Sequence, residues 1–554
     1  MEDIVNRLYA FDWRSLSLGS VPAPTPAPAP QSSVVHHLIA WWDQSKDSMQ
    51  QYSVASVAIA GFTALVVSVA LYRALFSQRQ RHDPLNQGCQ PLRMYPHKDR
   101  IFGLDFVYQN VTTFRRHKYL ETLKNRYQTL GTTYGVRVFN RRGILTSDPE
   151  NIKTILSTRF KDYSLGNRVP IMGPLLGRGI FVSDGQDWSH SRALLRPNFV
   201  KEQVADLQMI ETHLAQLLKL IPSDGRTVVE LQDLFLRFTL DSATDFLFGH
   251  SLHTLSRGTA KDQQFGQAFA LALDDIALQF RLGPWRALRR PNKDALAAYE
   301  ICRGYVEGFV ADAMAYRHGK ASSTGDKNTS DRSYFLKELA QATDDRDRIR
   351  DELLNILIAG RDTTASLLGS LFYVLARHPE VWQKLRSEAA TQLQGAAPNY
   401  EQLRNLQYTR HCINETLRLY PPVPNNTKMA VCDTILPRGG GPKGDAPVFV
   451  PKGCTMIYTV YAMHRRTDLF GPDAEEFRPE RWATQRFSWE FLPFNGGPRI
   501  CLGQQYALTE AMYVLVRFAQ TFQTIEAQDP APWTEQLTLT LASNNGVKVR
   551  LKGA

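Results

Sequence analysis

The chain of 554 residues is long enough for one large core or several domains, and its 43% hydrophobic and 21% charged residues are ordinary for a globular protein. Its six cysteines are scattered without a CxxC pair or a Cys/His cluster, which argues against a zinc site and against a disulfide-rich secreted scaffold. The net charge of +11 is spread out and accompanies no recognition motif, so we expect an acidic protein partner or a membrane surface and no nucleic acid.

The first predicted element is a single membrane-spanning helix. Residues 48–72 contain no charged side chain, and as a helix they are about long enough to cross a ~30 Å hydrocarbon layer. Two other interpretations fit less well. A signal peptide would begin near the first methionine, and a helix in a protein core would be amphipathic, whereas this segment is apolar all round. Arginines gather after the segment, so the positive-inside tendency predicts a cytosolic C-terminal part and a lumenal, Pro/Ala-rich tail, residues 1–47.

One large unit is predicted after this helix. Residues 73–100 carry the Pro and Gly of a linker, and residues 101–554 form a mostly helical unit with small β-sheets. Helical periodicity is clear in residues 204–220, 351–376 and 408–420. The runs APVFVP and MIYTVYAM are of β type, and residues 321–332 are typical of an exposed loop.

The most informative stretch is FNGGPRICLG, residues 494–503, whose cysteine could be a buried thiol, half of a disulfide or a metal ligand. A thiolate is a good ligand for haem iron, and the tight turn that it needs beneath a flat macrocycle is permitted by glycine. The residues after Cys501 have helical character, so amide N–H groups at a helix N-terminus would favour the anion. Arg499 is placed to pair with a haem propionate, and Phe494 to cover the proximal side.

This loop resembles the haem-binding signature of the cytochrome P450 family at five positions: Phe494, Gly497, Arg499, Cys501 and Gly503. The resemblance extends roughly from residue 95 to the C-terminus. It implies the P450 fold, mainly α with small β-sheets, and haem b bound to the protein through the thiolate of Cys501.

Two further motifs match the family in the expected order. ETLR supplies Glu415 and Arg418 on one helical face, and with Arg481 of FRPERW they are expected to form a buried structural charge network. LIAGRDTTAS supplies Asp362 for proton relay and Thr363 to hydrogen-bond dioxygen. Because a mid-helix Thr otherwise bonds back to a carbonyl, these roles predict a local break in the helix beside Gly360.

Further donors to the haem propionates are expected outside the cysteine loop. DWSHSRALLRPNF supplies Trp188 and Arg192, four apart on one helical face. Lys428 stands where the family pattern suggests an arginine, and lysine keeps the charge without the bidentate geometry. A basic face with Arg192, Arg196 and Lys201 is predicted to dock an acidic reductase.

Several stretches, among them AGRDTTA and FNGGPRICLGQQYA, resemble the fungal alkane- and fatty-acid-hydroxylating branch of the family. The resemblance implies a microsomal enzyme of the endoplasmic reticulum that hydroxylates the terminal carbon of a long chain, with electrons from NADPH through a flavoprotein reductase and with cytochrome b5 as a second partner. Alternatives are a tailoring oxygenase acting on an alkyl or polyene chain of a larger fungal product, a reductase-independent isomerase or lyase, and a non-catalytic haem-binding protein. Substrate contacts are expected in residues 163–179, 269–285, 423–425 and 542–545.

Overall fold

The computed structural model describes residues 59, 61–64, 67–68, 88–139, 141–199, 206–317 and 334–554. It divides the chain into two units, Met1–Gln87 and Gly88–Ala554. The described residues of the first unit are helical, but the predicted tail and most of the predicted spanning helix lie outside the described residues, as does the predicted loop at 321–332. Across the part of the chain that is described, none of the helices has the length and apolar character needed to cross a bilayer.

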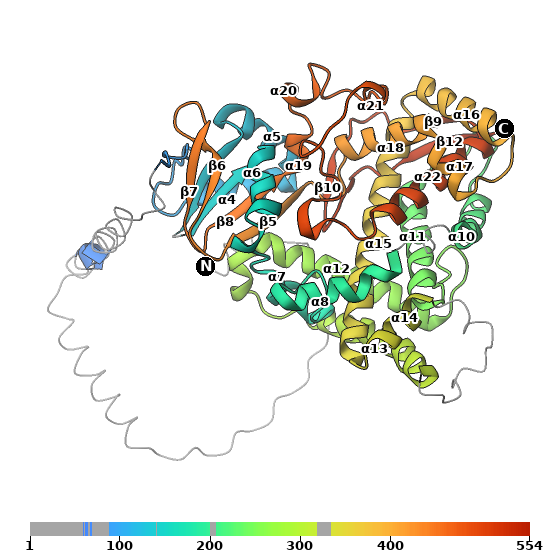
Figure 1. Cartoon of the computed structure of the whole chain (residues 1–554), viewed down its shortest axis with the longest axis horizontal. Helices are drawn as coiled ribbons and strands as arrows, with labels where there is room; N and C mark the ends of the chain where they lie inside the picture. Colours follow the sequence, from blue (N-terminus) through green and yellow to red (C-terminus); the bar gives the residue numbers. More distant parts are fainter. Residues whose placement is uncertain are drawn as a thin grey trace, which may run out of the picture. The chain divides into compact units, whose positions relative to one another are not determined.

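The second unit is mainly helical, as predicted (Figure 1). Its α-helices are α4 (Leu104–Arg115), α5 (Tyr119–Leu130), α6 (Pro149–Lys153), α7 (Arg168–Leu176), α8 (Gly185–Leu195), α10 (Leu207–Lys219), α11 (Leu231–Phe248), α12 (Ala260–Leu282), α13 (Lys293–Arg317), α14 (Tyr334–Ala342), α15 (Arg346–Leu375), α16 (Pro379–Leu393), α17 (Tyr400–Asn405), α18 (Gln407–Leu419), α19 (Val460–Met463), α20 (Thr467–Phe470), α21 (Arg481–Thr484) and α22 (Gln504–Thr521). Short turns of other helix types are η3 (Thr154–Thr158), η4 (Phe160–Asp162), η5 (Arg196–Phe199), η6 (Gly283–Leu288) and η7 (Gly497–Arg499).

The strands form four small sheets. Their bounds are β1 (Thr133–Val138), β2 (Arg141–Thr146), β3 (Tyr163–Ser164), β4 (Val229–Glu230), β5 (Asn425–Ala430), β6 (Thr434–Gly440), β7 (Ala446–Val450), β8 (Thr455–Thr459), β9 (Phe522–Ala527), β10 (Glu535–Leu537), β11 (Leu541–Ser543) and β12 (Lys548–Gly553). The largest sheet has the order β1-β2-β8-β5-β3, with β2 and β8 parallel and the other neighbours antiparallel. The remaining sheets are β6-β7, β10-β11 and β4-β12-β9.

Helix α15 is the central element of this unit. It begins after Asp345, whose side chain accepts a hydrogen bond from the amide of Arg348, and from Thr364 to its end every residue is buried. A helix that is buried all round must lie inside a helical layer. Accordingly α15 packs against α7, α11, α13, α14, α18 and α22, and Figure 1 shows it crossing the middle of the helical region.

Two large apolar clusters meet along α15. One joins it to α10, α11, α16, α18 and α22, and contains Phe235, Phe372 and Phe518. The other joins its N-terminal half to α7, α12, α13 and α14, and contains Phe269 and Leu354. The polar groups of α15 therefore lie between two tightly packed regions, where a side chain has little freedom to move.

Most of the predicted helices and strands are present in the structure. The periodic runs coincide with α10, α15 and α18, and APVFVP contains β7, so these predictions are confirmed. The second predicted β run is wrong in part: MIYT belongs to β8, but VYAM forms the short helix α19. All four residues of α19 are buried, so packing rather than the β propensity of Val and Tyr decides its conformation.

Candidate functional site

The cysteine loop is shaped by two close backbone approaches. The amide of Cys501 donates to the carbonyl of Phe494 at 3.0 Å, which closes the loop. Gly497 has φ +67°, and a Cβ atom there would lie 2.0 Å from the carbonyl oxygen of Leu156 in η3. Only glycine fits this position, because a side chain would collide with fixed backbone. The close approach predicted for the glycines is thus present, and it seats the loop on η3.

Cys501 lies three residues before α22, and the predicted helix after it is confirmed. Its side chain is exposed although protein surrounds it, as expected for a sulfur that faces an internal space. Burial raises the pKa of the Cys501 thiol, whereas the Gly503 amide and the positive charge of Arg192 act in the opposite direction. A metal cation bound to the sulfur would offset the remaining burial cost, since coordination deprotonates a thiol outright.

Two arginines connect the cysteine loop to α8 and to the residues just before α8. Arg499 donates to the carbonyl of Ser183 at 2.9 Å and to Asp184 Oδ1 at 2.7 Å, and its Nε has no hydrogen-bond partner among the residues that the structure describes. Arg192 donates to the carbonyl of Ile500 at 2.9 Å. Both guanidinium groups lie beside the indole of Trp188, at 4.5 Å for Arg499 and 5.9 Å for Arg192. The predicted propionate donors are therefore neighbours.

Lys428 adds a further cation close to Arg168 and Arg499. It lies on β5, is only 3% exposed, and has no carboxylate within ion-pair distance among the described residues. Burial, followed by the charges of Arg168 and Arg499, lowers the pKa of Lys428 to about 7. Buried cations without sufficient counter-charge are costly, and a ligand with two carboxylates would neutralise them. The residues present therefore fit the propionates of haem.

The distal pair lies on α15. The Thr363 hydroxyl donates to the carbonyl of Ala359 at 2.6 Å, and α15 continues without interruption through this turn. The predicted helix break beside Gly360 is therefore wrong, because the hydroxyl satisfies the carbonyl within an intact helix. Burial raises the pKa of Asp362, while Arg361, at 3.1 Å from its Oδ1, acts in the opposite direction.

The predicted charge network is fully assembled. Glu415 and Arg418 share two hydrogen bonds of 2.9 and 2.8 Å, and Arg481 donates to the same carboxylate at 2.9 Å. All three side chains are at most 1% exposed. The indole of Trp482 donates to Glu415 at 3.0 Å, and Asp473 lies 3.2 Å from Arg481. This network ties α18 to α21.

Contacts link the predicted substrate regions to one another or to α15. The second region lies on α12 and η6, which pack against α7 of the first region, and Arg286 donates to the carbonyl of Pro170 at 3.3 Å. Arg168 donates to Asn426, next to the third region, at 2.6 Å. β11, in the fourth region, joins α15 through a hydrogen bond from Ser366 to the carbonyl of Leu541. Of these regions, the second approaches the turn of α15 that carries Asp362, where the guanidinium of Arg361 lies 5.6 Å from the centre of the Phe269 ring.

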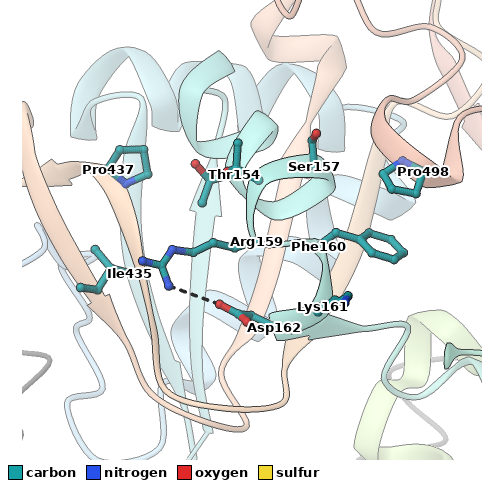
Figure 2. Close-up of a pocket in the computed structure, with 10 residues that line it drawn as sticks. Thr154, Ser157, Arg159, Phe160, Lys161, Asp162, Ile435, Pro437 and Pro498 are labelled. Atoms are coloured by element: carbon teal, nitrogen blue, oxygen red, sulfur yellow. Dashed lines mark hydrogen bonds and ion pairs between the residues drawn. The ribbon is translucent and has the colours of Figure 1, made fainter.

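A separate pocket is lined by none of the residues predicted to contact substrate (Figure 2). It has a volume of about 750 Å³ and opens between η3, η4 and β6, with Pro498 of the cysteine loop on its rim. Its walls are mainly hydroxyl and charged side chains, among them Arg159 and Asp162, which are paired at 3.5 Å. Because neither Cys501 nor Thr363 lines this pocket, it is not the place of oxidation.

Some residues of the site were not predicted. Arg168 and Asp184 shape the charge around Lys428 and Arg499, and Trp482 completes the Glu415 network. Trp482 follows Arg481 directly, so the motif FRPERW contained a signal for it. No signal in the sequence marked Asp184, because its contact with Arg499 joins residues that are far apart in the chain.

Comparisons with known proteins agree with this geometry. The family described as cytochrome P450 matches residues 103–549. The cytochrome P450 monooxygenase fsdH of Fusarium heterosporum is 54% identical over 94% of this chain and 92% of its own length. The cytochrome P450 monooxygenase FPY7 of Fusarium mangiferae is 47% identical over 92% and 98%, and cytochrome P450 52A12 of Debaryomyces hansenii is 42% identical over 82% and 90%. The chain therefore belongs to the cytochrome P450 family and is a monooxygenase, and membership of this family implies a haem-thiolate cofactor and electrons from a reductase.

Proposed function

We propose that this monooxygenase hydroxylates the terminal carbon of a long lipophilic chain, with alkanes and fatty acids as the leading substrate class. The supporting observation is the apolar character of the elements around Asp362 and Thr363. α7 contributes four buried apolar residues, and α12 contributes Phe269 and Leu273. Apolar surfaces of this kind suit an extended hydrocarbon better than a hydrophilic substrate. The resemblance of AGRDTTA to the alkane- and fatty-acid-hydroxylating branch points to the same class.

A second candidate is the oxidation of an alkyl or polyene tail on a larger fungal product. Two departures from the family pattern leave room for it: Lys428 stands in place of an arginine, and the N-terminal tail carries a long Pro/Ala run. Both candidates require the same chemistry and differ only in what the chain is attached to.

The reaction consumes one O2, two electrons and two protons, and it converts one C–H bond into C–OH with release of water. Haem b held by Cys501 would supply the activation of oxygen. The protein would supply anchoring of the propionates by Trp188, Arg192, Lys428 and Arg499. Asp362 is suited to deliver protons, because burial raises its pKa and its carboxyl group therefore holds a proton more readily than an exposed aspartate. The hydroxyl of Thr363 would orient dioxygen beside that proton source.

Electrons are proposed to arrive from NADPH through a flavoprotein reductase, with cytochrome b5 as an additional donor. Arg196 is exposed and follows α8, which makes it suited to dock an acidic partner, whereas Arg192 is engaged with the cysteine loop. Lys201 lies outside the described residues. Charge reversal at Arg196 should slow reduction at low salt and leave the haem spectrum unchanged; unchanged reduction would disprove this docking site.

Residues 48–72 are proposed to anchor the enzyme in the endoplasmic reticulum, with residues 1–47 in the lumen. The charge-free segment and the arginines after it support this orientation. A glycosylation sequon introduced into the tail should be modified in microsomes, and the protein should resist carbonate extraction. An unmodified tail would reverse the orientation.

The substrate class is tested by expression in yeast microsomes with a reductase. Alkanes, fatty acids and a fungal metabolite extract are supplied in parallel, and products are identified by mass spectrometry. Terminally hydroxylated lipid is expected in the first two incubations. If oxidised product arises only from the extract, the second candidate replaces the first. Conversion without NADPH would contradict both.

A further inference from the structure

One turn of α15 faces the segment between α7 and α8, residues 177–184, which we call the connector. The side chains of Asp351, Glu352 and Asn355 on this turn are 5%, 0% and 0% exposed. Their carboxylate and amide oxygens accept hydrogen bonds from three backbone amides of the connector. The bonds join Asp351 to Arg178 at 2.8 Å, Glu352 to Ile180 at 3.0 Å and Asn355 to Phe181 at 2.9 Å.

Side chains of a distant helix thus satisfy three amides of the connector, whereas the amides of Val182 and Ser183 donate to the carbonyl of Gly179 within it. The amide group of Asn355 also donates to the carbonyl of Leu176 at 2.9 Å, at the end of α7. Apolar packing between α7 and α15 already buries this region. Directional hydrogen bonds add what apolar packing lacks, which is a single preferred register between the two segments.

Two glycines make the close approach possible. A Cβ atom on Gly177 would lie 1.9 Å from Asp351 Oδ2, and one on Gly179 would lie 2.0 Å from Asn355 Nδ2. Gly177 has φ +56°, which L-residues rarely adopt, whereas Gly179 has an ordinary φ. At Gly179, therefore, it is only the lack of space for a side chain that requires glycine.

The connector leads directly to the cysteine loop. It ends at Ser183 and Asp184, which bind the guanidinium of Arg499 at 2.9 and 2.7 Å. A second link comes from Arg348, which donates to the carbonyl of Arg178 at 2.8 Å and to Ser191 of α8 at 3.2 Å. A continuous path of contacts therefore joins α15 to the loop that carries Cys501.

We propose that Asp351, Glu352 and Asn355 form a latch that sets the position of the cysteine loop relative to the turn of α15 with Asp362 and Thr363. The latch lies about two to three helical turns before that turn, on the same rigid helix. Its residues are positioning residues, because they act through the connector and Arg499. A displacement of about 1 Å between reacting groups can cost on the order of a hundredfold in rate, so a fixed register has functional value. The proposal holds for either substrate class.

The test uses full-length holoenzyme in microsomal membranes with a reductase. Gly179→Ala pushes a methyl group against Asn355, Asn355→Ala removes the amide group, and the double variant restores the space. The matched control is Gly304→Ala on α13, where an added Cβ meets nothing within 4 Å. The readouts are deuterium exchange in residues 176–183, the ferrous–CO spectrum, and the fraction of consumed NADPH that appears as hydrogen peroxide.

We expect Gly179→Ala to speed exchange in the connector about tenfold and to raise the peroxide fraction severalfold, with the ferrous–CO band retained. The double variant should behave no worse than Asn355→Ala alone, because without the amide group the added methyl meets no obstacle, and Gly304→Ala should match the wild type. If the effects of the two substitutions on the exchange rate and on the peroxide fraction simply multiply in the double variant, the two residues act independently and the proposal is wrong. If Gly179→Ala fails to fold, Asn355→Ala alone decides: connector exchange at the wild-type rate refutes the latch, and faster exchange with the band retained supports it.

Discussion

Replacement of Glu415 by Gln is expected to destabilise the holoenzyme strongly. The carboxylate accepts five hydrogen bonds: two from Arg418, and one each from Arg481, the Arg478 amide and the Trp482 indole. A glutamine amide turned either way places its NH2 group against at least two of these donors. The substitution also removes the counter-charge of two guanidinium groups with fully buried side chains.

The magnitude follows from these contacts. Breaking a buried ion pair by removing one partner costs about 3–5 kcal/mol, because the remaining charge stays buried. Unfolding entropy is about 2.1 cal/mol/K per residue, so for a unit of about 450 residues 1 kcal/mol corresponds to roughly 1 °C. Glu415→Gln should therefore lower the Tm by about 3–5 °C.

The matched control is Glu211→Gln. Glu211 pairs with Arg517 at 3.0 Å, but both side chains remain partly exposed, at 25% and 21%. Such a pair contributes at most about 1 kcal/mol, so the expected shift is about 1 °C or less. Thermal unfolding is followed by circular dichroism and by the ferrous–CO band on matched holoenzyme samples. Equal Tm shifts for the two variants would show that the network around Glu415 is not a buried charge cluster of this strength.

Three further outcomes are expected. Cys501→Ala should abolish the long-wavelength ferrous–CO band; a surviving band would mean that another residue holds the iron. Thr363→Ala should raise the peroxide fraction of consumed NADPH severalfold with little change in haem content, and unchanged product per NADPH would contradict the role of the hydroxyl. Burial raises the pKa of Glu510 to about 7, so the folded state binds more protons than the unfolded state between about pH 4.5 and 7, and stability should fall as pH rises through this window, by at most about 1.4 kcal/mol per pH unit. Glu510→Gln should flatten that slope in denaturant titrations, and an unchanged slope would assign it to other groups.

The parts of the site that were predictable are those whose chemistry is local. FNGGPRICLG carries its own turn residues and ligand, and Glu415 and Arg418 are neighbours on one helical turn. The prediction of a helix break beside Gly360 failed for the opposite reason. Whether the hydroxyl of Thr363 bonds back to Ala359 or a break opens beside it depends on how α15 is packed, which its neighbours in the sequence do not specify.

Amino-acid order alone determined the family, the thiolate ligand and the helical character of the main elements, because these depend on residue type and short spacing. Tertiary structure decided which distant groups meet: Arg499 with Asp184, Lys428 with Arg168 and Arg499, and Asn355 with the connector. Each of these contacts joins segments far apart in the chain. Their geometry is set by the packing of whole helices and sheets, and a linear pattern of residues carries no direct record of it.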